Sequence, residues 1–226
     1  KKFNALNKKY DGKFSLFIRK RSYIRTEGNY SGKERKRGAV LALCSLLAKK
    51  DNTFDTVICP NQFLSSSVYL ITLDSDTRLG MGDVRTMVSA MLHPTNKPVI
   101  KNGRVIKGHA ILQPKIATSL SSSHKTPFTI TMTCPWGNNG YRSVDFELYQ
   151  TLFERSTFCG KGILNIEIFN TLLHDKFQEE RILSHDTIEG AILSCGYLSC
   201  VTLTDSHPQN PISYYKRQHR WIRGDI

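Results

Sequence analysis

The sequence predicts an α/β domain whose central sheet is mostly parallel and flanked by helices. Stretches with strand-like and helix-like apolar spacing alternate along the chain without an internal repeat, which is typical of such domains. The apolar run 68–72 is followed at once by an acidic pair, as expected where a buried strand ends at a ligand site. With 226 residues, 39% hydrophobic and 23% charged, the chain can bury the core of a single domain.

The first third of the chain leads up to this central strand. A polar surface segment, 1–12, precedes a strand over 14–18 and a charged loop over 19–32. A helix follows over 34–49, because its apolar residues recur at helical spacing. The run 68–73 is then the central strand.

The elements after the central strand follow from turn and helix signals. A helix over 82–92 has an acidic residue in its first turn and a proline beyond its end. Asn102-Gly103 predicts a turn between the short strands 98–100 and 104–106. The remaining predictions are strands at 110–113, 128–132 and 197–203, helices at 146–153, 166–173 and 186–194, and loops at 119–123 and 159–162.

The net charge of +13 restricts the class of partner. Nucleic acid, an anionic membrane surface and phosphorylated substrates all fit such a balance, and so does a lysine-rich solvated surface. Basic residues gather near the start and again near the end, at Lys216, Arg217, Arg220 and Arg223.

Cysteine spacing and hydropathy exclude other classes. The six cysteines include no CxxC pair, which argues against a zinc site, and Cys44 and Cys200 lie in apolar runs that suit buried free thiols in a reducing compartment. The charged start does not resemble a signal peptide. The longest apolar-leaning run, 39–48, is too short to span a bilayer.

The acidic pair Asp74 and Asp76 is the first candidate site. Side chains two apart on extended backbone point the same way, so both carboxylates can reach one hard cation, which in turn can hold a phosphate. A simple turn is the alternative reading.

Three further segments carry polar residues at suggestive places. Lys36 and Arg37 open a helix and could bind phosphate, or they are a solvated helix start. Gly160 and Gly162 would let a ligand approach the backbone closely, or they form a plain turn. Asp186 could be a general base, or a charge that stabilises a helix N-terminus.

The segment 217–225 is the densest in functional side chains. Arg217, Arg220 and Trp221 suit an anionic leaving group beside a flat sugar face. A basic amphipathic helix that contacts a membrane or RNA is the alternative.

Together these segments closely resemble the glycosyltransferase domain of bacterial cyclic β-1,2-glucan synthases, relatives of the cellulose, chitin and hyaluronan synthases. The resemblance covers nearly the whole chain and rests on six segments in order: 34–38 (ERKRG), 72–77 (TLDSDT), 111–114 (ILQP), 160–163 (GKGI), 181–186 (RILSHD) and 217–225 (RQHRWIRGD).

The resemblance implies a GT-A-type fold, UDP-glucose as donor, a β-glucan acceptor, Mg²⁺ or Mn²⁺ as cofactor, and inversion to give β-1,2 links. It assigns the metal and diphosphate to Asp74 and Asp76, and the base to Asp186. Further donor contacts are expected from Lys36, Arg37, Arg217 and Arg220. Acceptor contacts are expected from Trp221, Gly160, Gly162 and His185.

The resemblance also sets expectations for the whole chain. Residues 1–226 would be a single, partial catalytic core that lacks the first strand of the fold and the C-terminal membrane helices. Its relatives would work at the cytoplasmic face of the bacterial inner membrane, against an anionic surface and without nucleic acid. The rival hypotheses are a degenerate domain that binds nucleotide-sugar or glucan without turnover, and a basic nucleic-acid-binding module.

Overall fold

The computed structural model describes residues 2–25, 28–59, 64, 66–133, 148–174, 176–177 and 185–225. The chain divides into two compact units. Unit 1 comprises Lys1–Leu70 with Asn165–Arg181, and unit 2 comprises Ile71–Leu164 with Ile182–Ile226. Lys36 and Arg37 therefore belong to unit 1, and all other predicted site residues belong to unit 2.

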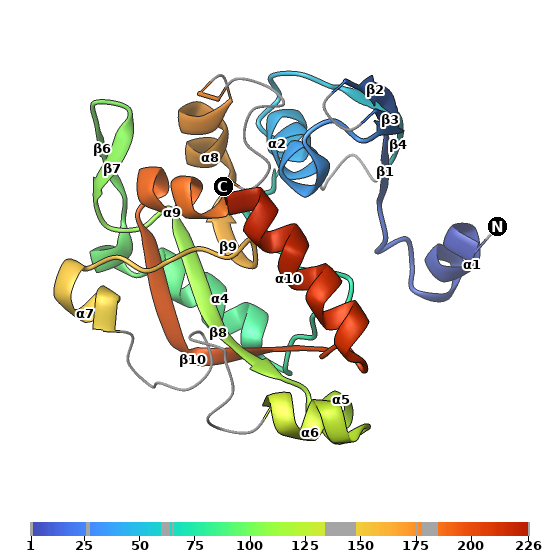
Figure 1. Cartoon of the computed structure of the whole chain (residues 1–226). Coiled ribbons are helices and arrows are strands. Elements are labelled where there is room, and N and C mark those ends of the chain that lie inside the picture. The colour runs from blue at the N-terminus through green and yellow to red at the C-terminus, as the bar shows by residue number, and fades with distance from the viewer. Residues whose placement is uncertain are drawn as a thin grey trace. The chain divides into compact units, whose positions relative to one another are not determined.

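Unit 1 combines small antiparallel strand pairs with two packed helices (Figure 1). Strand β1 pairs with β4 and β2 with β3, so part of the segment predicted as a loop over 19–32 is a hairpin. Helices α2 and α8 pack together and confirm the helices predicted from apolar spacing. The elements are α1 (Lys2–Lys9), β1 (Leu16–Arg19), β2 (Ser22–Ile24), β3 (Asn29–Ser31), α2 (Arg35–Leu47), β4 (Phe54–Ile58) and α8 (Ile166–Leu173).

Unit 2 is organised by a four-stranded sheet in the order β10-β8-β9-β5. Figure 1 shows its two long strands, β8 and β10, side by side. Ile111 is paired with Cys195 and Leu112 with both Gly196 and Ile163, and these residues contribute to the buried core. The strands are β5 (Tyr69–Thr72), β8 (Ile111–Thr118), β9 (Gly162–Asn165) and β10 (Cys195–Asp205), with a separate hairpin of β6 (Val99–Lys101) and β7 (Arg104–Lys107).

The prediction of a mostly parallel central sheet of the GT-A type is wrong for the residues that the structure describes. Only β8 and β10 pair in parallel, whereas β8 and β9 are antiparallel. Ile166 N–H donates to Val68 O, and the Thr72 hydroxyl at the other end of β5 donates to Gly160 O, so β5 and β9 also run in opposite directions. Alternation of strands and helices along a sequence does not fix which strands pair, and here the pairs are largely antiparallel.

Helices surround this sheet. Helix α4 contacts β10, and α9 contacts β7. The start of α10 is held by aromatic packing, because Tyr214 stacks on His207 at 5.6 Å and meets the edge of Phe128 at 5.8 Å. The helices are α4 (Asp83–Leu92), η1 (Pro94–Asn96), α5 (Leu120–Ser123), α6 (Pro127–Thr133), α7 (Leu148–Phe153), α9 (Asp186–Leu193) and α10 (Pro211–Asp225).

Two local predictions fail between β8 and α7. The segment 128–132 is part of helix α6 and not a strand, and the serine-rich segment forms the short helix α5. Threonine favours strands, yet here its hydroxyls donate to carbonyls one turn back, with Thr133 Oγ1 2.6 Å from Thr129 O and Thr131 Oγ1 3.0 Å from Pro127 O. Proline at the first position also favours the helix start.

Candidate functional site: a mixed-charge centre in unit 2

The acidic pair lies in a turn just beyond β5. The strand ends at Thr72, and Thr77 N–H donates to Asp74 O at 3.1 Å. The argument from extended backbone therefore does not apply to Asp74 and Asp76. Two backbone hydrogen bonds between Arg78 and Thr204, at 2.9 and 3.1 Å, fasten the turn to the end of β10.

A lysine lies between two carboxylates at this turn. The Lys161 Nζ is 3.1 Å from Asp74 Oδ2 and also donates to Asp205 Oδ2. Thr77 Oγ1 donates to the other oxygen of Asp205 at 2.6 Å. Burial alone would lower the pKa of Lys161, but its hydrogen bond to Asp205 and the charges of Asp205 and Asp74 outweigh burial and raise the pKa. The ammonium is therefore charged at neutral pH.

The loop that carries Lys161 is fixed from β8. Gln113 Oε1 accepts from the Cys159 N–H at 3.0 Å and from the Cys159 Sγ at 3.1 Å. Gly162 packs so closely on β8 that a Cβ would lie 2.2 Å from Leu112 O. Gly162 therefore allows the loop to pack closely on strand β8 of the protein itself.

Asp186 lies against the same loop. Gly160 has a φ of 78°, and a Cβ there would lie 2.9 Å from Asp186 Oδ2, so glycine leaves room for this carboxylate. Burial raises the pKa of the Cys159 thiol to about 12, with the charges of Asp186 and Asp205 adding to it and that of Lys161 opposing it. Cys159 is therefore a neutral hydrogen-bond donor and not a nucleophile.

His185 is the N-cap residue of α9, which begins at Asp186. Only 2% of His185 is exposed, which disfavours a direct contact with an acceptor. Ser184, a plausible cap for the helix predicted over 186–194, lies outside the described residues.

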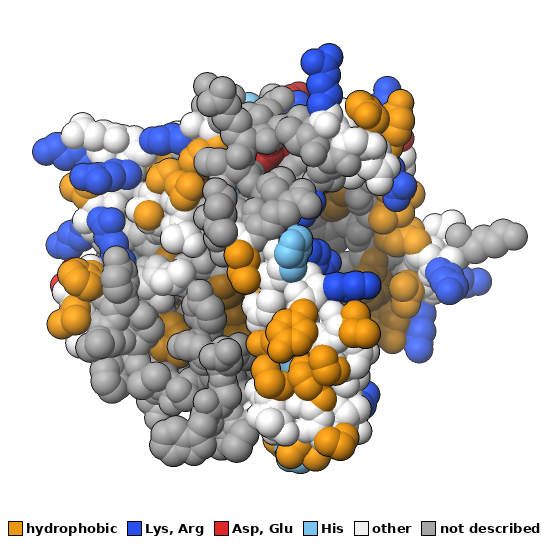
Figure 2. Space-filling view, in the orientation of Figure 1, with side chains coloured by type: hydrophobic (Ala, Val, Ile, Leu, Met, Phe, Trp, Pro, Cys, Tyr) orange, Lys and Arg blue, Asp and Glu red, His pale blue; other side chains and the backbone are white. Residues whose placement is uncertain are grey.

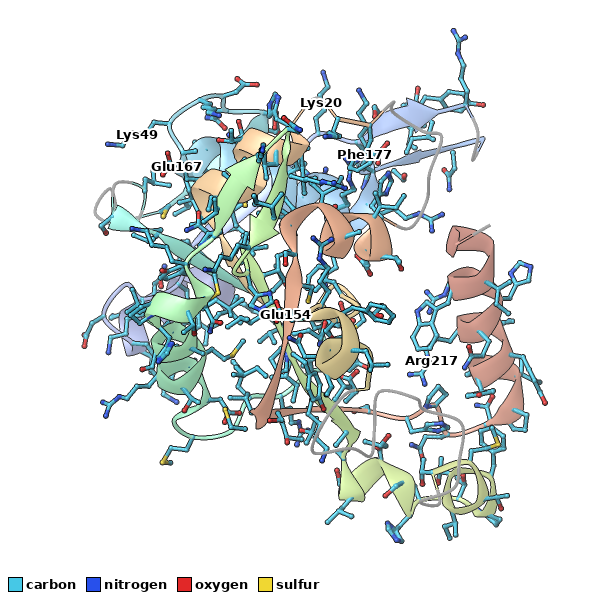
Figure 3. The ribbon with its side chains drawn as sticks, turned by 90° about the vertical axis from the view of Figure 1, so that its left-hand side faces the viewer. Lys20, Lys49, Glu154, Glu167, Phe177 and Arg217 are labelled. Carbon is cyan, nitrogen blue, oxygen red and sulfur yellow. The ribbon has the colours of Figure 1, made fainter. Side chains whose placement is uncertain are left out.

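Figure 3 shows Arg217 on the side of α10 that faces the rest of unit 2. Its guanidinium lies 4.9 Å from the centroid of the Trp221 ring and donates to Ser206 O at 3.3 Å. Burial lowers the pKa of Arg217, while the charges of Asp76 and Asp205 oppose that shift. Its Nε is buried and has no hydrogen-bond partner among the residues that the structure describes, so it could still donate to an anionic ligand.

The outer face of α10 is apolar and basic. Figure 2 shows hydrophobic side chains over this helix beside His and Lys or Arg. Arg220 is exposed there, and a shallow hollow is lined by Ile212, Tyr215, Lys216, His219 and Arg220. Trp221 is exposed as well, but its ring lies with Arg217.

Lys36 and Arg37 lie at the start of α2 in unit 1. Arg37 pairs with Glu34 at 2.9 Å and lies 4.8 Å from the centroid of the Phe177 ring. The carbonyls of Lys33 and Arg35 accept from Arg19 at 2.8 and 2.6 Å. The Arg37–Glu34 ion pair and the hydrogen bonds from Arg19 both stabilise the start of α2.

Asp205, Lys161 and Gln113 have no role predicted from the sequence. Asp205 has the same signal as Asp74, because it too is an acidic residue beyond an apolar strand, here 197–203. Gln113 and Lys161 lie within the segments 111–114 and 160–163 that carry the resemblance, but their roles depend on contacts between distant segments.

A divalent cation at the acidic turn would have few protein ligands. In the described part of the chain, no three His, Cys, Asp or Glu side chains gather closely enough to hold a metal ion. Mg²⁺, however, is commonly bound by one or two carboxylates together with substrate phosphates and water. Asp74 and Asp76 are the two carboxylates that this turn could offer to such a cation.

Membrane anchoring by a helix has no candidate here: within the described ranges, none of the helices combines the length and the apolar character that a bilayer span requires.

Comparison with known proteins relates the chain to one enzyme. No protein-family model matches it. The sequence is 34% identical over 221 residues to the cyclic beta-(1,2)-glucan synthase NdvB of Rhizobium meliloti (strain 1021). The match covers 96% of this chain but 8% of the relative's length. The chain is therefore homologous to one region of a cyclic β-(1,2)-glucan synthase.

Proposed function

We propose that this chain is the catalytic region of an inverting glucosyltransferase that transfers glucose from UDP-glucose to a growing β-1,2-glucan. Homology to a glucan synthase supports the reaction class, although the relative is a much longer protein. The single observation that carries the proposal is the mixed-charge centre, where Asp74, Lys161, Asp205 and Arg217 meet beside Asp186.

This centre has the charges that a nucleotide-sugar requires. Arginine side chains bind phosphate oxygens through several parallel hydrogen bonds, and Arg217 retains a free donor at Nε. Arg217 and Arg220 would stabilise the negative charge that develops on the leaving diphosphate. The donor site proposed here includes no contact from Lys36 and Arg37, because both belong to unit 1.

Asp186 would remove the proton from the acceptor hydroxyl. Its carboxylate lies against Gly160, in the loop that carries Lys161. A single displacement with inversion needs only one such base and no covalent intermediate. A positioned general base contributes about 10²- to 10⁴-fold to the rate. Trp221 offers an exposed ring for the flat face of an acceptor sugar.

A bound Mg²⁺ or Mn²⁺ would neutralise charge on the leaving diphosphate. Asp74 and Asp76 would hold it. The Asp76 side chain is exposed, and the Asp74 side chain is 40% exposed, so both are accessible to a cation brought by the nucleotide.

We further propose that the net positive charge of the chain, +13, favours binding to an anionic membrane surface. No separate observation favours nucleic acid as a partner over this reading.

Calorimetric titration of the chain with UDP-glucose and UDP, with and without Mn²⁺, tests the donor site. Binding that requires Mn²⁺, together with transfer of labelled glucose to a β-1,2-glucan acceptor, would support the enzyme. Binding without transfer would point to a degenerate binding domain. Absence of any UDP binding, with nucleic-acid binding that weakens steeply with salt, would overturn the proposal.

A further inference from the structure

The Lys161 ammonium lies next to the Asp74 carboxylate, where a metal ion bound to Asp74 would compete with it. Its side chain is 10% exposed and forms ion pairs with Asp74, in the turn after β5, and with Asp205, at the end of β10. An ammonium and a divalent cation beside one carboxylate repel each other, and this repulsion is strong where water is largely excluded.

We propose that Lys161 is a resident cation that blocks the acidic turn to free metal and releases Asp74 only when a diphosphate arrives with the metal. The inference rests on the proposed donor site and adds to it an order of binding. A diphosphate brings the negative charge that lets the ammonium and the metal coexist. Lys161 would then exchange its hydrogen bond with Asp74 for one with a phosphate oxygen.

The two carboxylates differ in a way that makes Asp74 the partner that is exchanged. The Asp205 side chain is 19% exposed and accepts from Thr77 Oγ1 at 2.6 Å. Asp74 is 40% exposed. Asp205 therefore anchors the ammonium while Asp74 turns to the metal.

The loop keeps the lysine in reach during this exchange. Gln113 fixes Cys159 through two hydrogen bonds, and the Thr72 hydroxyl donates to Gly160 O at 3.2 Å. A fixed loop limits Lys161 to movements of its own side chain, which has three donors to distribute.

The proposal predicts a coupling between two ligands. When two ligands favour the same state of a protein, each raises the affinity of the protein for the other by the same factor. In the unmodified chain, UDP should raise Mn²⁺ affinity strongly, because it removes the block. Without the ammonium, free Mn²⁺ should bind more tightly, and UDP should add less.

The test measures Mn²⁺ affinity by electron paramagnetic resonance, with and without UDP. We expect Lys161→Met and Lys161→Gln to bind free Mn²⁺ at least about tenfold more tightly than the unmodified chain and to show a smaller gain from UDP. Lys161→Gln retains a donor for Asp205 if the methionine variant is unstable. Lys107→Met, at an exposed lysine of β7, is the matched control and should not differ from the unmodified chain.

Two results would overturn the inference and are distinguishable. If the unmodified chain binds Mn²⁺ only with UDP, but both Lys161 variants do the same, Lys161 is not the block and the donor site stands. If UDP and Mn²⁺ do not affect each other in any variant, the metal site itself falls, and the inference with it.

Discussion

The start of α2 in unit 1 and the centre in unit 2 both concentrate basic side chains, but they use them differently. In unit 1, Arg37 is paired with Glu34 and lies over Phe177, all within the local fold. In unit 2, Lys161 and Arg217 face carboxylates from the acidic turn and from the end of β10.

The difference separates structural from chemical use of charge. Cations that tie a helix start to its neighbours contribute mainly to stability. Opposite charges gathered from several segments, partly buried and beside a general-base candidate, are the feature on which the proposed donor site rests. Substitutions in unit 2 should therefore affect binding and transfer, whereas those in unit 1 should affect folding.

The largest effect is expected for Asp186→Asn. Loss of the base should reduce glucose transfer about 100-fold or more while leaving the UDP dissociation constant unchanged. Initial rates of transfer and calorimetry with UDP measure the two quantities separately. Glu154→Gln makes the same acid-to-amide change at an exposed position of unit 2 and should leave both unchanged. Equal losses of binding and transfer would instead assign Asp186 to the metal or to the fold.

The next effect concerns the acidic turn. Asp74→Asn or Asp76→Asn should remove most of the Mn²⁺-dependent gain in UDP affinity, about 30-fold at the lower end of the cost of breaking a charge pair. Titrations with and without Mn²⁺ isolate this gain, and the melting temperature checks the fold. If both variants kept their Mn²⁺-dependent affinity for UDP, the metal assignment would be wrong.

The sequence predicts local elements well where apolar spacing is strong. The helix at 166–173 is α8 to the residue, and the turn at Asn102-Gly103 joins β6 and β7. The strand predicted over 128–132 is instead part of helix α6, which begins at Pro127, a residue type favoured at the first helical position.

Whether neighbouring strands run parallel or antiparallel could not be predicted from local sequence patterns. Strand pairing depends on contacts between segments such as β8 and β9, which lie some fifty residues apart in the sequence. For the same reason the sequence indicated Asp74 and Asp186 by motif but not the Lys161–Asp205 pair, which forms only when the loop and β10 meet.

A pair of arginine substitutions compares the two units directly. Arg217→Ala should weaken UDP binding about tenfold, the loss expected for a hydrogen bond between charged groups. Arg37→Ala should lower the melting temperature, because it removes an ion pair and a cation–π contact that are largely buried, and leave UDP affinity unchanged. The same UDP loss in both variants would contradict the division of roles and place α2 in the donor site.

The smallest effect concerns the exposed lysines of α1 in unit 1. We expect the chain to co-sediment with anionic vesicles at low salt and to be released at high salt, because each lysine near such a surface contributes about 1 kcal/mol that salt screens. Lys2→Gln and Lys8→Gln should each reduce vesicle affinity about fivefold and leave UDP binding unchanged. Vesicles of neutral lipid are the control. Retention at high salt would instead indicate an apolar contact, for which exposed Tyr215 and Ile222 on α10 are the candidates, and Tyr215→Ala would then release the chain. If no binding occurs at any salt concentration, the positive charge serves substrate binding or solubility alone.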